Sequence, residues 1–183
     1  PELKSALGDM EAPVRQWAAF ALGRIGTEGA SATAELAKLF SSDPDPVIRS
    51  EAALSIGLLG TSAKEAIPAL LGCFAEGKEK DANVRTQAAK SLGKMEDELK
   101  KHGRVVIDAV VKEPNKDVRI YLLISLSTAL KLDTAAYVKE LADLLSKEPE
   151  GEVRVVIVQE LGGLGPAAVE ALPALRSATT DVQ

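Results

Sequence analysis

The sequence predicts an all-α solenoid built from about five two-helix repeats. Three observations lead to this prediction. One motif recurs five times at spacings of 34, 36, 34 and 35 residues, each copy has the apolar periodicity of a helix, and a second apolar segment fits between successive copies. The composition agrees, because aromatic residues make up only 3% of the 183 residues, whereas alanine and leucine, which suit close-packed helices, are frequent.

Each copy of the motif starts at an apolar residue directly before an arginine, here called the anchor. The five anchors are Val14, Ile48, Val84, Val118 and Val153. Apolar residues recur four, five, eight and eleven positions after the anchors, which makes one stripe of a helix with 3.6 residues per turn. Five copies in one register predict a repeat array, in which each copy contributes one helix.

The ends of these helices carry start and stop signals. The residues three positions before the anchors are Glu11, Asp45, Asp81, Asn115 and Glu150. Asp and Asn at this place predict N-caps, because their side-chain oxygen accepts a hydrogen bond from an otherwise unpaired backbone N–H. Gly26, Gly60 and Gly165 follow the apolar stripe and predict a left-handed C-cap.

A second, less regular set of helices fits between the copies. The candidate segments are Ser31–Phe40, Ala66–Phe74, Arg104–Val111, Ala135–Leu145 and Ala168–Leu175. Pro68 and Pro173 hold equivalent places in two of them, and a proline in mid-helix costs about 3 kcal/mol. We therefore expect each of these two helices to begin close to its proline, after a bent lead-in.

The two ends of the sequence look like incomplete repeats. Leu3–Leu7 resembles the tail of a first-type helix, and Leu172–Ala178 resembles a first-type helix without its partner. We therefore expect residues 1–183 to form one repeat domain with partial repeats at both ends, taken from a longer array. Ends of this kind expose apolar surface that a capping repeat would cover, so we also expect self-association through them.

The motif Asp-x-x-Val-Arg-x-x-Ala-Ala-x-x-Leu-Gly-x-Ile-Gly resembles the HEAT repeat, and in particular the short HEAT-like repeat of the phycobilisome-lyase type. Segments Asp45–Gly60 and Asp81–Met95 match it most closely, and the resemblance covers nearly all of the chain. Tetratricopeptide repeats share the period, but their large aromatic positions are absent, as is the Thr-Pro-Leu-His turn of ankyrin repeats. The resemblance implies antiparallel helix pairs stacked into a right-handed, armadillo-type superhelix, with the second helices lining its concave face.

The composition and the few cysteine and histidine residues argue against several classes of function. The formal net charge of −5 lacks the basic excess of most nucleic-acid binders. Cys73 and His102 are the single cysteine and histidine, which leaves no disulfide framework and no Cys/His metal site. No apolar run reaches the roughly 18 residues of a membrane span, and no signal peptide is present, which favours a cytoplasmic location. We expect no nucleic-acid or membrane partner, no cofactor and no enzymatic activity.

An arginine follows every anchor, and two interpretations of this ladder are open. The five residues are Arg15, Arg49, Arg85, Arg119 and Arg154. They could bind anions, because a guanidinium contacts phosphate or carboxylate with two parallel hydrogen bonds. They could instead be structural, because each lies beside the core stripe in the first helical turn, where it can reach an acidic or Asn cap of its own or a neighbouring repeat. Their place next to the core favours the structural ladder.

Positions two, three, six and ten after each anchor share the helix face opposite the core. A face that meets only water should be polar, yet this face is largely apolar in copies one, four and five. The predicted partner-binding residues are Trp17, Phe20, Leu54, Leu58, Ile120, Tyr121, Ile124, Val155 and Val156. Exposed apolar strips mark partner sites, and Trp and Tyr are favoured interface anchors. The alternative is that tight curvature buries these residues as core, and full burial of Trp17 would support that alternative.

Two functions fit these patterns. The first is a non-catalytic protein–protein interaction scaffold that holds a peptide or protein partner on the concave face. The second, implied by the resemblance to phycobilisome-lyase repeats, is a lyase or chaperone-like module for a bilin chromophore. A HEAT-like DNA glycosylase would need a basic concave face with an acidic catalytic residue among aromatics, which Lys90 and Lys94 alone do not supply.

Overall fold

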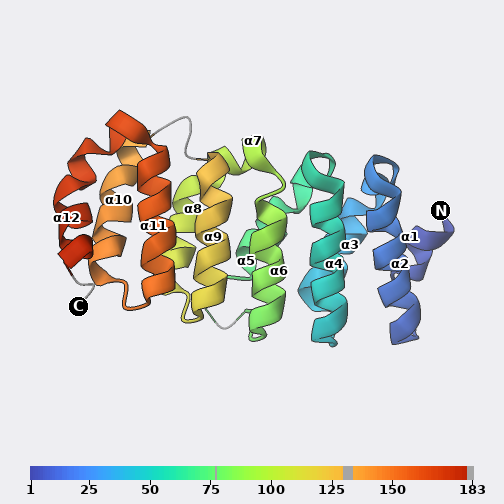
Figure 1. The fold of residues 1–183 in the computed structure, drawn as a ribbon. Coiled ribbons are helices and arrows are strands. Elements are labelled where there is room, and N and C mark those ends of the chain that lie inside the picture. The colour runs from blue at the N-terminus through green and yellow to red at the C-terminus, as the bar shows by residue number, and fades with distance from the viewer. Residues whose placement is uncertain (77, 130–133, 181–183) are drawn as a thin grey trace. The chain divides into compact units, whose positions relative to one another are not determined.

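The structure, a computed structural model, describes residues 1–76, 78–129 and 134–180, and all regular elements in these ranges are helices (Figure 1). The chain forms two compact units, Pro1–Leu99 and Lys100–Gln183. Within the described ranges, no helix combines the length and the apolar character needed to cross a membrane. The predicted all-α solenoid of stacked helix pairs is confirmed, and each unit contains stacked helix pairs of its own.

The first unit stacks its second helices side by side. Its α-helices are α1 (Glu2–Ala6), α2 (Ala12–Ile25), α3 (Thr33–Ser42), α4 (Pro46–Leu59), α5 (Ile67–Gly72), α6 (Ala82–Leu92) and α7 (Glu96–Leu99), and its 3₁₀ helices are η1 (Gly26–Ala32) and η2 (Gly60–Ala66). Helix α4 packs against α2 on one side and α6 on the other, while α3 and α5 pack behind them (Figure 1).

The second unit repeats this arrangement. Its helices are η3 (Lys100–His102), α8 (Gly103–Lys112), α9 (Lys116–Ala129), α10 (Thr134–Lys147), α11 (Gly151–Gly163), η4 (Gly165–Ala171) and α12 (Leu172–Thr180). Helix α9 packs against α11, and α8 and α10 pack behind them (Figure 1). The five motif copies are thus α2, α4, α6, α9 and α11.

The predicted N-caps are confirmed at the three positions occupied by Asp or Asn. Asp45 Oδ1 accepts from the N–H of Val47 at 2.8 Å, and Asp81 Oδ1 accepts from that of Asn83 at 2.8 Å. Asn115 Oδ1 accepts from the N–H of residue 117 at 2.9 Å. Helices α2 and α11 also begin after the predicted residues, but the longer glutamate side chains there make no capping hydrogen bond.

The predicted glycine stops occur with a different backbone geometry. Gly26 and Gly60 have φ values of 76° and 56°, but their ψ values of −144° and −136° lie outside the left-handed helical region. Only glycine adopts this conformation readily, because a Cβ would clash with the backbone. The chain then continues into a 3₁₀ turn rather than into a loop.

These 3₁₀ turns are the predicted bent lead-ins. Helix α5 begins at Ile67 directly after η2, and α12 begins at Leu172 directly after η4, so Pro68 and Pro173 lie in the first helical turn. A proline is tolerated there because the N–H that it lacks would have no partner inside the helix.

Four of the five anchors are core residues. Ile48 is 1% exposed, and Val84, Val118 and Val153 are fully buried. Val14 differs, with 39% of its side chain exposed. Its expected burial is wrong, and α2, on which it lies, is the first motif helix, with only the five-residue α1 before it.

Small residues bring neighbouring second helices close together. Ser55 Oγ on α4 donates to the carbonyl oxygen of Ala19 on α2 at 2.8 Å, and Ser91 Oγ on α6 donates to that of Ala53 at 2.7 Å. A Cβ added at Gly57 would lie 2.9 Å from Ser91 Cβ and 3.0 Å from its Cα. The junction between α4 and α6 therefore has no room for a larger residue at position 57.

We predict that Gly57→Ala lowers the free energy of unfolding of the whole chain by about 1–3 kcal/mol, because the added methyl group must push α4 and α6 apart. Denaturant unfolding followed by circular dichroism measures the change. Gly72→Ala is the matched control, since a Cβ there would meet no atom within 4 Å. Equal effects of the two substitutions would contradict the close packing at this junction.

Candidate functional site

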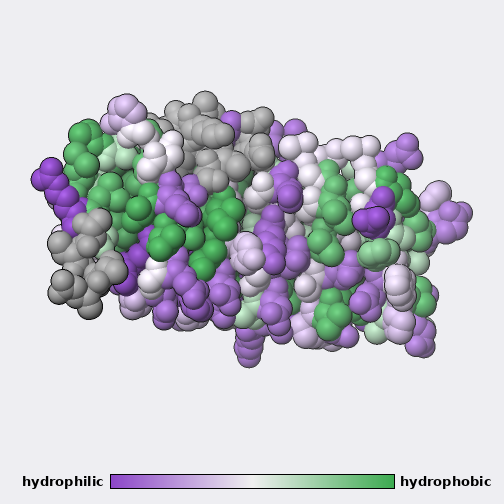
Figure 2. All heavy atoms as spheres, in the orientation of Figure 1, coloured by the Kyte–Doolittle hydropathy of each residue, from purple (hydrophilic) through white to green (hydrophobic). Residues whose placement is uncertain are grey.

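The candidate site is described unit by unit. It is the face formed by positions two, three, six and ten after the anchors, on α2, α4 and α6 in the first unit and on α9 and α11 in the second, and it is here called the second-helix face of each unit. Figure 2 shows this face in the orientation of Figure 1. In the first unit, hydrophobic side chains gather over α2 and α4, and hydrophilic ones cover α6. In the second unit, hydrophobic side chains gather over α9 and α11.

Helix α2 presents an exposed aromatic pair. Trp17 is 67% exposed and Phe20 is 38% exposed. Their rings meet edge to face, with centroids 5.4 Å apart and planes at 84°, a preferred geometry for aromatic pairs. Trp17 is therefore not part of the core, and the pair forms a preassembled apolar surface.

The remaining predicted residues of the face range from half-buried to exposed. On α4, Leu54 is half-buried and Leu58 is 46% exposed. In the second unit, the half-buried members are Ile120, Tyr121 and Val156, and the exposed ones are Ile124 and Val155. The prediction placed these residues on the outward face, and none of them is fully buried.

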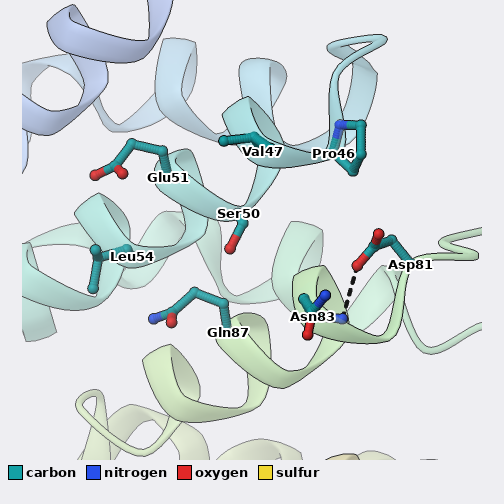
Figure 3. A pocket seen from close by; sticks show the side chains of 8 residues that line it. All are labelled: Pro46, Val47, Ser50, Glu51, Leu54, Asp81, Asn83 and Gln87. Carbon is teal, nitrogen blue, oxygen red and sulfur yellow. Dashed lines mark hydrogen bonds between the residues drawn. The ribbon is translucent and has the colours of Figure 1, made fainter.

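A groove lies in this face between α4 and α6. Its volume is about 240 Å³, and its lining residues are Pro46, Val47, Ser50, Glu51, Leu54, Asp81, Asn83 and Gln87 (Figure 3). The first five come from α4, and the others come from α6 and its cap. Leu54 is the one predicted partner-binding residue among them, and Ser50, Glu51 and Gln87 also hold positions of the predicted face. The groove itself was not predicted, because it exists only where two helices meet.

Glu51 has an unusual environment in this groove. Its Oε1 is buried and has no hydrogen-bond partner among the described residues. Burial raises the pKa of the Glu51 carboxyl above its ordinary value, because the charged form loses hydration. The sequence shows Glu51 as one more polar residue of the outward face, and no pattern in it indicates a buried oxygen.

Two arginines of the first unit, Arg15 and Arg49, bind carboxylates of the next repeat. Arg15 Nε donates to Asp43 Oδ2 at 2.6 Å, and Arg49 Nε donates to Glu79 Oε2 at 2.7 Å. Arg49 Nη1 also donates to the carbonyl oxygen of Asp43 at 2.8 Å, and Arg85 Nη1 donates to that of Glu79 at 2.9 Å. The guanidinium groups of Arg49 and Arg85 therefore also bind the turns just before their own helices.

The second unit shows the same contacts. Arg119 Nε and Nη2 donate to the two carboxylate oxygens of Glu148 at 3.0 and 2.7 Å. Arg154 Nη1 donates to the carbonyl oxygen of Glu148 at 3.0 Å. The side chains of Arg119 and Glu148 are only 10% and 3% exposed. A paired, largely buried guanidinium of this kind is occupied within the fold and has few donors left for an external anion.

The carboxylates that pair with the ladder arginines do not belong to the predicted N-cap residues. They belong to the residues two positions before those N-caps. Glu79 Oε1 also accepts from the backbone N–H of Asp81 at 2.8 Å. The residues at this place in the five copies are Asp9, Asp43, Glu79, Glu113 and Glu148. The expectation that the caps themselves pair with the arginines is therefore wrong. An acidic residue five positions before every anchor is the sequence signal that marks the ladder's partners.

Glu160 is a second carboxyl with a raised pKa. It lies on α11, seven residues after its anchor, where α4 and α6 carry the buried Ser55 and Ser91. Burial raises the pKa of Glu160 to about 7. A titratable group therefore stands where the first unit uses a neutral hydroxyl.

The remaining candidates from the sequence are Cys73 and His102. Cys73 is 7% exposed within the apolar core, and His102 ends the short η3. Among the side chains that the structure describes, no three His, Cys, Asp or Glu residues group together as ligands for a metal ion.

A family model described as HEAT repeats matches residues 1–80. The first 80 residues are thus similar to HEAT repeats. No curated protein matches the sequence.

Two solved structures show this likeness in fold. One concerns microtubule plus-end tracking by XMAP215, CLIP-170 and EB1, with a TM-score of 0.65 and 19% identity over 100% of this chain and 84% of that one. The other is the complex of CpcE and CpcF of phycocyanin lyase from Nostoc sp. PCC7120, with a TM-score of 0.64 and 18% identity over 87% of this chain and 96% of that one. At these identities the likeness is one of fold.

We predict that Arg49→Ala lowers the free energy of unfolding by about 2–4 kcal/mol, because Glu79 is left as an unpaired, nearly buried carboxylate. Chemical denaturation of the whole chain at neutral pH measures the loss. Arg24→Ala is the control, because Arg24 is exposed, and its effect should stay within about 0.5 kcal/mol.

The loss at Arg49 should shrink in acid. Burial raises the pKa of Glu79, but hydrogen bonds from Arg49 and from the Asp81 N–H outweigh burial, so the pKa ends below its ordinary value. A carboxyl of this kind contributes stability above its unfolded pKa, and that stability is lost as pH falls through the folded pKa. A loss that is independent of pH would contradict the assignment of Glu79 as the partner.

We predict that Glu160→Gln stabilises the chain at pH 8 and has little effect at pH 4.5. The folded pKa lies above the unfolded one, so native Glu160 keeps its proton between about pH 4.5 and 7, and stability falls as pH rises through this window. Thermal unfolding at the two pH values tests this. Glu170→Gln, at an exposed position on η4, is the control, and equal shifts for both variants would contradict the prediction.

Proposed function

We propose that this helical-repeat chain is a non-catalytic scaffold that binds a protein or peptide partner on its second-helix face. The observation that carries the proposal is the Trp17–Phe20 pair, with Trp17 67% exposed. Covering apolar surface contributes about 25 cal/mol per Å², and tryptophan is enriched among the residues that dominate binding energy. A partner that covers the pair would therefore gain affinity from a surface that is already in place.

The second unit supports the same proposal. Ile124 on α9 and Val155 on α11 are 46% and 56% exposed. In both units the core is made by the opposite stripe of these helices, so these outward residues lie outside the core. A contiguous apolar surface of this kind is the usual mark of an interaction site.

The arginine ladder and the burial of Cys73 support a role without catalysis. Three arginines that could have bound an anionic substrate, Arg15, Arg49 and Arg119, are engaged with carboxylates. Cys73 is buried. We propose that the chain supplies binding surface and leaves any chemistry to its partners.

A module that handles a bilin chromophore is the second candidate. The fold likeness to the phycocyanin lyase complex, which covers 96% of that chain, favours it. The two candidates differ in a direct measurement. A bilin-handling module shifts the visible absorbance of an added bilin, and a protein-binding scaffold leaves the spectrum unchanged.

Affinity capture with the whole chain as bait tests the first candidate. We expect Trp17→Ala to lose a specific protein partner and Tyr121→Ala to weaken it, with unchanged helicity by circular dichroism. Met10→Ala is the matched control, because Met10 is 95% exposed and lies outside the second-helix face. If every captured protein binds Trp17→Ala and wild type equally, this face is not the binding site.

A further inference from the structure

The groove between α4 and α6 combines an apolar wall with polar side chains, one of which, Glu51, has a buried oxygen without a hydrogen-bond partner among the described residues. Val47 is 57% exposed and Leu54 half-buried, and both belong to the wall from α4. Ser50 lies opposite Asn83 and Gln87 across the groove (Figure 3). A ligand for this groove therefore needs an apolar stem and a polar end.

Glu51 sets the charge of that polar end. Leaving a carboxylate oxygen buried without a hydrogen bond is costly, and Glu51 Oε1 is buried in this way. The ladder carboxylates of the same unit show the contrast, because Asp43 and Glu79 are each paired with an arginine. Glu51 thus has the requirement for a cation but no cation of its own.

The surroundings of Glu51 do not supply that cation. None of the groove's lining residues is a lysine or arginine, and Asp81 adds a second carboxylate at the other end. The first unit, residues 1–99, also carries fifteen Asp and Glu against eleven Lys and Arg. This charge balance attracts positively charged partners and accelerates their approach.

We propose that the groove receives an arginine or lysine side chain of the protein partner, with the Glu51 carboxylate as its counter-ion. The aliphatic stem of that side chain lies along Val47 and Leu54. Its cationic head donates to the Glu51 carboxylate. Arginine suits the site better than lysine, because it is more weakly hydrated and offers several donors in one plane.

The Trp17–Phe20 pair on the neighbouring helix α2 suggests a second contact for the same partner. Trp17 and Glu51 both lie three residues after their anchors, and α2 packs against α4. An extended peptide that crosses from α2 to α6 can therefore place an apolar residue on Trp17 and a basic residue at Glu51. The inference rests on the proposed function and adds the chemistry of the partner at one position.

Selection from a random nonapeptide library on the whole chain tests the proposal. We expect peptides selected on wild type to be enriched in arginine or lysine at one position, and peptides selected on Glu51→Gln to lack this enrichment. Glu28→Gln removes one charge at an exposed site on η1, and it should select as wild type does. Enrichment of acidic or purely apolar peptides would overturn the proposal.

Binding of one selected peptide then measures the contact. Glu51→Gln should weaken binding about tenfold, replacing the peptide's basic residue by glutamine should weaken it equally, and the two changes together should do little more. Independent effects of the two changes would overturn the pairing. If the selected peptides need Trp17 for binding but no basic residue, this inference is wrong and the proposed function stands. If no selected peptide depends on Trp17, the proposed function is wrong as well.

Discussion

The stack depends on a guanidinium that closes two junctions at once. In the first unit, Arg49 holds the turn before its own helix through the Asp43 carbonyl and holds the next repeat through the Glu79 carboxylate. Glu79 in turn fixes the Asp81 N–H at the start of α6. Because charged hydrogen bonds are directional and strong when little water reaches them, this contact sets the register of one repeat on the next. Arg119 and Glu148 do the same in the second unit.

The core stripe and the arginine ladder hold the repeats together, so the residues of the outward face can vary. The core needs only the apolar stripe and the ladder, so the positions between them carry residues as different as Trp17, Glu51 and Val155. Repeat proteins gain stability mainly from contacts within and between neighbouring repeats. A surface residue can therefore change without disturbing the stack, and an aromatic or an unpaired carboxylate can be kept for binding.

Sequence periodicity predicts the helices well and the site only in part. Asp45 and Gly60 mark both ends of α4, because capping is local chemistry within a few residues. The exposure of Val14 and the ψ value of Gly60 depend on neighbouring elements, which periodicity does not describe. The partner-binding residues lie on the outward face as predicted, and their role in binding stays a prediction. Glu51 could not be singled out, because the burial of its oxygen depends on how helices pack around it, which periodicity does not describe.

The close approach of α4 and α6 also decides the shape of the groove above it. Gly57 and Ser91 meet inside the junction, whereas Glu51 and Gln87 line the groove outside it. The width of the outer groove is therefore set by buried atoms that no partner touches. A methyl group gained or lost at the buried junction would therefore change the width of the groove. It would change which side chains fit there, although the residues that line the groove stay the same.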